Sequence, residues 1–148
     1  MTHIDHPVLN ETVRRIADGP HLSVLGTIDA DGKAQTSVIL ITREDDNILF
    51  STIKGRRKTT NMARDARVNL LLQVLPILGP NYATISGTVE LTDDPDGSFH
   101  QMMYDIHMGG AVPPPEPLAQ RVIVRIVPRQ VYLPPAYDPG SDAGGEGA

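Results

Sequence analysis

The chain has 148 residues and a mass of 16.0 kDa, which is the size of one domain with one core. Its net charge of −5 at pH 7 argues against general affinity for nucleic acid or anionic membranes, and its 4% aromatic content argues against stacking platforms for bases. The lack of cysteine excludes a disulfide framework and thiolate chemistry. Because no apolar run approaches the ~18 residues that span a bilayer, and no apolar leader starts the chain, we expect a cytoplasmic protein.

The N-terminal part of the chain predicts a short helix followed by a series of strands. Apolar residues from Leu9 to Ala17 recur at helical spacing, and Gly19-Pro20 ends this helix. Residues 21–29 and 34–43 are typical of two strands, and an Ala-Asp-Gly segment between them supplies the chemistry of a hairpin turn. A shorter strand, Ile48 to Thr52, follows a polar turn.

The middle of the chain predicts a second helix and two longer strands. The helix runs from Arg57 to Arg64, with Met62 and Ala63 facing inward. Residues 68–74 are apolar enough for a strand that is buried on both faces. Residues 82–92 alternate between polar and apolar, as in a strand with one buried face.

The C-terminal part predicts a third helix, a loop and a last strand. The helix follows a turn at Asp93 to Gly97, and we expect its Met102 and Met103 to pack against the core. A loop rich in Gly and Pro precedes the strand Arg121 to Val127, with Pro128 at the edge or the end of that strand.

These elements predict a mainly β fold in one domain. About six strands joined by hairpins, with a few short helices, fit a small antiparallel barrel whose ends are closed by helices. We assign residues 1–133 to this domain. Residues 134–148 are rich in Pro, Gly and Asp, which is typical of a disordered acidic tail.

The most informative segment is the basic turn, which we define as Lys54 to Asn61. It places four cations within five residues, between a predicted strand end and a predicted helix start. Helix N-termini offer unpaired N–H groups and a positive potential, Gly55 lets backbone approach a ligand, and the guanidinium groups of Arg56 and Arg57 have forked donors. The pattern favours a phosphate site, but a solvated basic loop explains these residues alone equally well.

The rest of the chain offers no acid, base or nucleophile with a recognisable motif. The basic turn lacks the glycines of a P-loop, and no G-x-G-x-x-G follows a strand. His100 and His107 are seven positions apart on one helix, and His3 and His6 fall in the N-terminal segment, so we predict no metal site. We therefore predict no catalytic side chain, which suits a protein whose chemistry belongs to a bound cofactor.

Four segments resemble a known family in their order and spacing: Gly26 to Ile39 (GTIDADGKAQTSVI), Ile48 to Met62 (ILFSTIKGRRKTTNM), Arg64 to Leu70 (RDARVNL) and Ser86 to Leu91 (SGTVEL). This is the pyridoxamine 5′-phosphate oxidase-like (PNPOx-like) split β-barrel superfamily. Within it the chain most resembles the small actinobacterial flavin/deazaflavin oxidoreductases, many of which use coenzyme F420. The resemblance implies a six-stranded antiparallel split β-barrel with Greek-key topology, and a homodimer with cofactor sites at the subunit interface.

The resemblance also implies which residues bind the cofactor. The basic turn would hold its phosphate, mainly through Arg56 and Lys58, and the backbone of residues 35–38 would run beside its ring. Tyr82 would cover the site from the partner subunit. The complete set of predicted cofactor-binding residues is Gln35, Thr36, Ser37, Val38, Ser51, Thr52, Gly55, Arg56, Arg57, Lys58, Asn61 and Tyr82.

The function that this resemblance implies is hydride transfer from reduced F420 to a small electron-poor acceptor, such as an enone. FMN is the alternative cofactor, because the basic turn does not separate the two. Arg64 and Arg67 would extend a basic groove for the longer tail of F420, which favours F420. A non-catalytic protein that binds F420, FMN or haem is a further alternative. Residues 75–80 and 108–116 differ from the family pattern, so the identity of the substrate does not transfer.

Overall fold

The protein is described by a computed structural model that covers residues 9–19, 22–74 and 82–134. These residues form three helices and seven strands. The helices are α1 (Glu11–Asp18), α2 (Arg57–Arg64) and α3 (Ser98–His107). The strands are β1 (Ser23–Ile28), β2 (Ala34–Ile39), β3 (Thr42–Glu44), β4 (Asn47–Ile53), β5 (Arg67–Gln73), β6 (Tyr82–Asp93) and β7 (Arg121–Tyr132).

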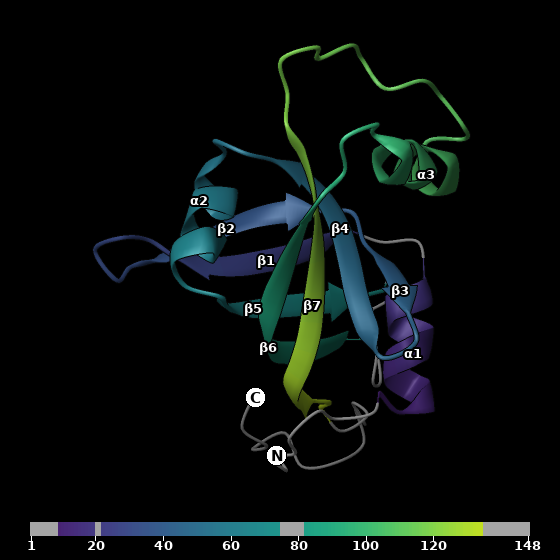
Figure 1. Cartoon of the computed structure of the whole chain (residues 1–148). Coiled ribbons are helices and arrows are strands. Elements are labelled where there is room, and N and C mark those ends of the chain that lie inside the picture. Colours follow the sequence, from purple (N-terminus) through teal and green to yellow (C-terminus); the bar gives the residue numbers. More distant parts are fainter. Residues whose placement is uncertain (1–8, 20–21, 75–81, 135–148) are drawn as a thin grey trace.

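All seven strands belong to one antiparallel sheet in the order β2-β1-β5-β6-β7-β4-β3. The sheet curls on itself, so that β4 and β7 cross in front of β1 and β5 (Figure 1). The predicted class, a mainly β split barrel with a few short helices, is confirmed. The described part of the chain has seven strands where we expected six.

The extra strand arises because the predicted strand 34–43 is divided. β2 ends at Ile39 on one edge of the sheet, and β3 begins at Thr42 on the other edge. The link between them contains Ile41, whose side chain is only 3% exposed within the core. The burial of Ile41 favours a path in which the chain crosses the end of the curled sheet between the two edges. The predicted single strand is therefore two strands, β2 and β3.

The core lies inside the curl and follows the alternation of the strands. Leu25, Phe50, Leu70 and Ile85 point inward and are fully buried. Each such side chain contributes roughly 1.5–3 kcal/mol relative to exposure. The prediction that residues 68–74 are buried on both faces is wrong: β5 alternates, because only one face of the sheet meets the core.

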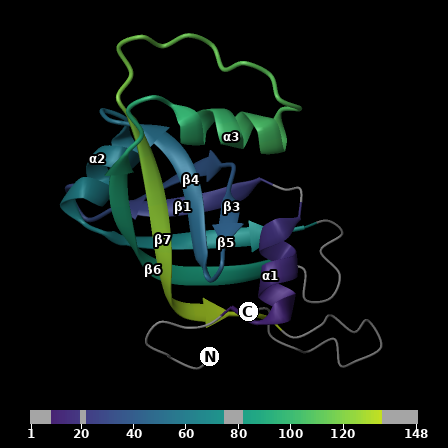
Figure 2. The same ribbon diagram turned by 45° about the vertical axis from the view of Figure 1, so that its right-hand side comes forward.

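The helices close the curled sheet from three sides. α1 packs on β3, β5 and β6 through Val13 and Ile16, α2 packs on β1 and β2, and α3 packs on β4 (Figures 1 and 2). Two inward-facing predictions need correction. Ala63 is exposed, whereas Met62 is buried, and Met102 is 41% exposed, whereas Met103 is 5% exposed. Each short helix packs only a narrow stripe of side chains against the barrel, so a residue next to a buried one in the sequence can point toward solvent.

The last strand, β7, runs four residues beyond Pro128. Pro128 lies opposite Gly87, where the β6–β7 register shifts, and β4 pairs with β7 only as far as Ile126. Pro128 therefore lies inside β7, but at a bulge and beyond the last β7 residue that pairs with β4. At this position the N–H group that proline lacks would have no hydrogen-bond partner on β4, so its absence costs no hydrogen bond there.

Some predictions concern residues outside the described ranges. The segment Leu75 to Pro80, His3 and His6 belong to this group, as does the tail from residue 135 onward. The division into a domain and a tail therefore stays a prediction. Within the described ranges, no helix combines the length and the apolar character needed to cross a bilayer.

Candidate functional site

The basic turn joins the end of β4 to the start of α2. Gly55 has φ +92°, and a Cβ at this position would meet nothing within 4 Å, so glycine is needed there for its backbone conformation and not for space. Arg56 occupies the N-cap position of α2, and its side chain makes no capping hydrogen bond. The first N–H groups of α2 therefore receive no hydrogen bond from the N-cap side chain, which suits an anion site.

Arg57 connects α2 to the end of β1. Its Nε donates to Asp29 Oδ1 at 2.8 Å, and its Nη2 forms an ion pair with the second carboxylate oxygen. Asn61 Nδ2 donates to the same Oδ1 at 2.9 Å and to Thr27 Oγ1 at 3.0 Å, while its own Oδ1 accepts a hydrogen bond from Arg64 Nη2 at 3.1 Å. The hydrogen bonds from Arg57, and then from Asn61, lower the pKa of Asp29.

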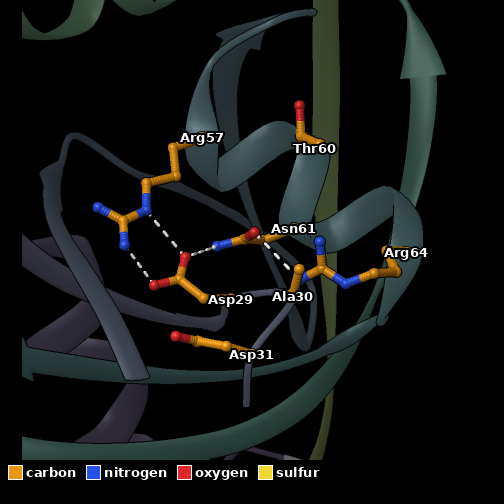
Figure 3. A pocket seen from close by; sticks show the side chains of 7 residues that line it. All are labelled: Asp29, Ala30, Asp31, Arg57, Thr60, Asn61 and Arg64. Carbon is orange, nitrogen blue, oxygen red and sulfur yellow. Dashed lines mark hydrogen bonds and ion pairs between the residues drawn. The ribbon is translucent and has the colours of Figure 1, made fainter. Parts of the chain in front are cut away.

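Asp29, Arg57, Asn61 and Arg64 line an open cavity of ≈ 520 Å³ between the β1–β2 turn and α2. Figure 3 shows Arg57 and Asn61 converging on Asp29, which lies between them, while Thr60 points away from this carboxylate. A fixed carboxylate at the centre disfavours a phosphate there. The predicted roles of Arg57 and Asn61 as cofactor ligands stay predictions, and their polar groups already have partners within the chain.

Lys58 lines a different cavity. It comes from the first turn of α2, and neither Lys58 nor Arg56 forms an ion pair with any described residue. Burial lowers the pKa of Lys58, and the positive charge of Arg56 lowers it further. An anion bound at this point would offset both effects. Lys54, the remaining cation of the basic turn, pairs with Asp93 at 3.2 Å. Arg56 and Lys58, which the family resemblance implied as the main phosphate contacts, are thus the two cations of the basic turn without an ion pair among the described residues.

The cavity beside Lys58, which we call the α3 cavity, has a volume of ≈ 230 Å³. It is lined by Val38, Ile39, Leu40, Ser51, Lys58, His100, Met103 and Tyr104. Ser51 Oγ and His100 Nδ1 are 3.3 Å apart and share a hydrogen bond. The rings of His100 and Tyr104 meet edge to face, with centroids 5.0 Å apart. Burial, and then the charge of Arg121, lowers the pKa of His100.

The sequence did not assign His100 and Tyr104 to any site. Their i, i+4 spacing on α3 is the one signal that places them on a common face. It becomes informative only once α3 is known to pack on β4.

β2, which was predicted to run beside the cofactor ring, is an edge strand. It pairs with β1 alone, so the backbone groups on its other side have no strand partner in the described chain. Gln35 Oε1 accepts a hydrogen bond from Thr27 Oγ1 at 2.5 Å, and Ser37 Oγ is buried without a hydrogen-bond partner among the described residues. On the outer face Thr36 is exposed and Val38 is 58% exposed. The open backbone edge is compatible with a ring lying beside it.

Two predicted site residues lie elsewhere. Thr52 is buried, and its Oγ1 lies 2.9 Å from Thr59 Oγ1, so this contact fixes α2 on β4; the role of Thr52 as a cofactor ligand stays a prediction. Tyr82 opens β6 opposite Gln73, at the far end of β5 from α2. In a single chain Tyr82 therefore does not reach the basic turn, and its contribution from a partner subunit stays a prediction. His, Asp and Glu residues of the described ranges form no group of three that could hold a metal ion.

A curled antiparallel sheet closed by short helices, with a cationic turn at a helix start, defines a split β-barrel protein. The profile of the family "Pyridoxamine 5′-phosphate oxidase" matches residues 9–133, and the chain belongs to that family. The resemblance found in the sequence is thereby confirmed. No curated protein matches the chain.

Solved structures with the same fold include three that are informative. A protein named F420 Reductase has a TM-score of 0.75 and 24% identity, with 84% of this chain and 98% of that chain covered. The conserved hypothetical protein Rv2991 from Mycobacterium tuberculosis has a TM-score of 0.72 and 20% identity, with 98% of each chain covered. General Stress Protein 26 from Bacillus anthracis has a TM-score of 0.64 and 21% identity, with 83% of this chain and 91% of that chain covered. At these identities the likeness is one of fold.

Proposed function

We propose that the protein is a cytoplasmic oxidoreductase that binds coenzyme F420 and reduces a small electron-poor acceptor such as an enone. The observation that carries the proposal is the pair Arg56 and Lys58. These cations stand without ion-pair partners in the described chain at the start of α2, and Lys58 is held in a half-buried position where a phosphate would stabilise its charge.

The residues present fit such a cofactor. Arg56, Lys58 and the first N–H groups of α2 would hold the phosphate, with charge-assisted hydrogen bonds worth ~1.5–3 kcal/mol each. The open backbone edge of β2 would lie against the ring. When bound in its reduced form, a deazaflavin supplies a hydride. The chain contributes orientation and a partly dry cleft.

FMN is the second candidate, because it also combines a tricyclic ring with a phosphate. Arg64 and Arg67 were expected to extend the groove for F420. In the structure Arg64 Nη2 donates to Asn61 Oδ1, and Arg67 Nε donates to Asp65 Oδ1 at 3.0 Å, so neither guanidinium is reserved for a tail. The F420 reductase among the structural neighbours favours F420. Parallel fluorescence titrations with F420 and FMN discriminate the two.

The proposal includes a homodimer with cofactor sites at its interface, in which Tyr82 of each subunit approaches the partner's site. The edge strand β2 supports such contact, because the backbone groups on its outer side have no strand partner in the described chain. Analytical ultracentrifugation tests the dimer, and a monomer across the micromolar range contradicts this part of the proposal.

The decisive experiment is the double substitution of Arg56→Ala and Lys58→Ala. We expect the Kd for F420, followed by fluorescence quenching, to rise at least about tenfold while the Tm stays nearly unchanged. Lys33→Ala is the matched control, since Lys33 is an exposed cation of the β1–β2 turn whose Nζ lies 3.8 Å from Asp31. Unchanged affinity in the double variant rejects the site. Tight binding without turnover of any acceptor instead identifies a cofactor-binding protein.

A further inference from the structure

We propose that the α3 cavity receives the organic acceptor, and that the Ser51–His100 pair binds the carbonyl oxygen of that acceptor. This inference rests on the proposed function and deepens it, because it assigns the acceptor a place in the fold and a binding residue that the sequence did not reveal. The proposal depends mainly on the position of His100 in this cavity.

The α3 cavity shares Val38, Ser51 and Lys58 with the predicted cofactor-binding set, but its size argues against the whole cofactor as its occupant. Its volume of ≈ 230 Å³ falls below the ~300–1,000 Å³ that is usual for a complete ligand pocket. A tricyclic ring with a phosphorylated side chain does not fit this space, whereas a compound with a single six-membered ring does. Lys58 is shared between this cavity and the basic turn, so a compound in the cavity lies beside the proposed cofactor.

The lining defines the chemistry of the occupant. Val38, Ile39, Leu40 and Met103 provide apolar walls, and the polar groups come from Ser51, Lys58, His100 and Tyr104. This combination suits a flat apolar body with one oxygen acceptor. A free carboxylate is less suitable, because Lys58 would then have to serve both this anion and the phosphate.

The Ser51–His100 hydrogen bond leaves one donor for a ligand in either neutral tautomer. If the ring N–H is on Nδ1, it donates to Ser51 Oγ, and the serine hydroxyl hydrogen is free. If the N–H is on Nε2, the hydroxyl donates to Nδ1, and the Nε2–H is free. A carbonyl oxygen accepts from either. Such a hydrogen bond draws electron density from a conjugated C=C bond and so makes its β-carbon a better hydride acceptor.

The fold holds His100 in place at the start of α3. The buried carboxylate of Asp94 accepts the backbone N–H of Phe99 at 3.3 Å and that of His100 at 3.1 Å, and so caps the helix. The charged groups that act on His100 are Arg121 of β7, Glu116 of the loop before it, and Asp94. Lys58 of α2 lines the same cavity. Burial, and then the charge of Arg121, lowers the pKa of His100 and so favours the neutral ring that the two tautomers require.

The test compares His100→Ala with His107→Ala, which is the matched control on the same helix. His107 Nε2 is 2.7 Å from Ile41 O and lies outside the cavity. The probe is 2-cyclohexen-1-one, and cyclohexene is its counterpart without the carbonyl group. We expect the KM for cyclohexenone to rise about five- to tenfold in His100→Ala, with the Kd for F420 within about twofold of wild type. His100→Gln, which keeps a donor, should recover part of the loss.

A second measurement does not depend on the cofactor. In cofactor-free protein, millimolar cyclohexenone should shift the NMR signal of the His100 ring, and cyclohexene should not. The inference is overturned if cyclohexenone causes no shift, if His107→Ala raises KM as much as His100→Ala, or if His100→Ala weakens F420 binding instead. If F420 fails to bind at all but the ring signal still shifts, the proposed cofactor is wrong and the α3 cavity remains a carbonyl site.

Discussion

Arg57 and Lys58 are adjacent in the chain but serve different cavities. Arg57 is paired with Asp29 at the end of β1, whereas Lys58 has no ion pair in the described ranges and lines the α3 cavity. Successive helical residues are separated by about 100° around the axis, so the start of α2 presents one cation to each side. The basic turn is therefore divided between a structural contact and an open cationic surface.

This division predicts opposite effects of two single substitutions. Arg57→Ala removes the ion pair that joins α2 to β1 and should lower the midpoint of urea unfolding, while changing the Kd for F420 by no more than about twofold. Lys58→Ala should raise that Kd about tenfold with little change in the urea midpoint, because its ammonium has no partner to lose among the described residues. Loss of affinity in Arg57→Ala equal to that in Lys58→Ala would show that both cations bind the phosphate.

The lowered pKa of Lys58 predicts a pH dependence of cofactor binding. The ammonium form binds the phosphate, so affinity is complete below the folded-state pKa and is lost as pH rises through it. Since burial and Arg56 lower this pKa, the loss should begin below the ordinary lysine value of 10.5. The measurement is the ratio of the Kd values of wild type and Lys58→Arg between pH 7 and pH 10. Arginine keeps its charge throughout this range, and ionisation of the ligand cancels in the ratio. A constant ratio contradicts the assignment.

Acid stability should depend on two carboxylates next to α2. A side-chain hydrogen bond from Arg67 lowers the pKa of Asp65 to about 2, and one from Arg57 lowers the pKa of Asp29. Because these pKa values are lower in the folded than in the unfolded chain, the stability they contribute is present above pH ~3.9 and is lost as pH falls through the folded values. The urea midpoint should therefore drop between pH ~4 and pH ~2. Asp65→Asn should show a smaller drop, and a drop of the same size would exclude Asp65 as a contributor.

The local signals in the sequence were sufficient to predict the helix that follows the basic turn. The predicted helix from Arg57 to Arg64 has the observed bounds, because the cationic turn with Gly55 and the spacing of Met62 are both local features. The division at Leu40-Ile41 was not predictable in this way. Residues 38–41 are continuously apolar and contain no turn former, and the break depends on where Ile41 is buried in the finished barrel.

The α3 cavity required the tertiary structure for a similar reason. Ser51 and His100 are 49 positions apart, and they meet only because α3 packs on β4. Sequence spacing reports neighbours within one helix or strand, but it does not report which helix covers which strand. For Lys58 the sequence indicated the charge, and the structure added that this ammonium is half-buried beside a cavity.

The bulge in β7, where Arg129 is the extra residue opposite Ser86 and Gly87 of β6, predicts that two glycines of the same sheet respond oppositely to alanine. A Cβ on Gly87 would lie 2.5 Å from Val127 O, a backbone atom fixed by the β6–β7 pairing, whereas a Cβ on Gly26 would lie 3.6 Å from Asn69 O. Gly87→Ala should therefore cost ~1–3 kcal/mol through overpacking. Gly26→Ala should be neutral or stabilise the fold by up to ~1 kcal/mol, since alanine restricts the unfolded chain.

Urea unfolding of both variants measures this difference, and the slope of the transition checks that each remains two-state. The two substitutions add the same methyl group to extended backbone, so their difference isolates the close approach of β7 at the register shift. Equal midpoints for Gly87→Ala and Gly26→Ala would mean that the β7 backbone gives way to the added methyl group, and that the bulge beside Pro128 is not a rigid feature of the barrel.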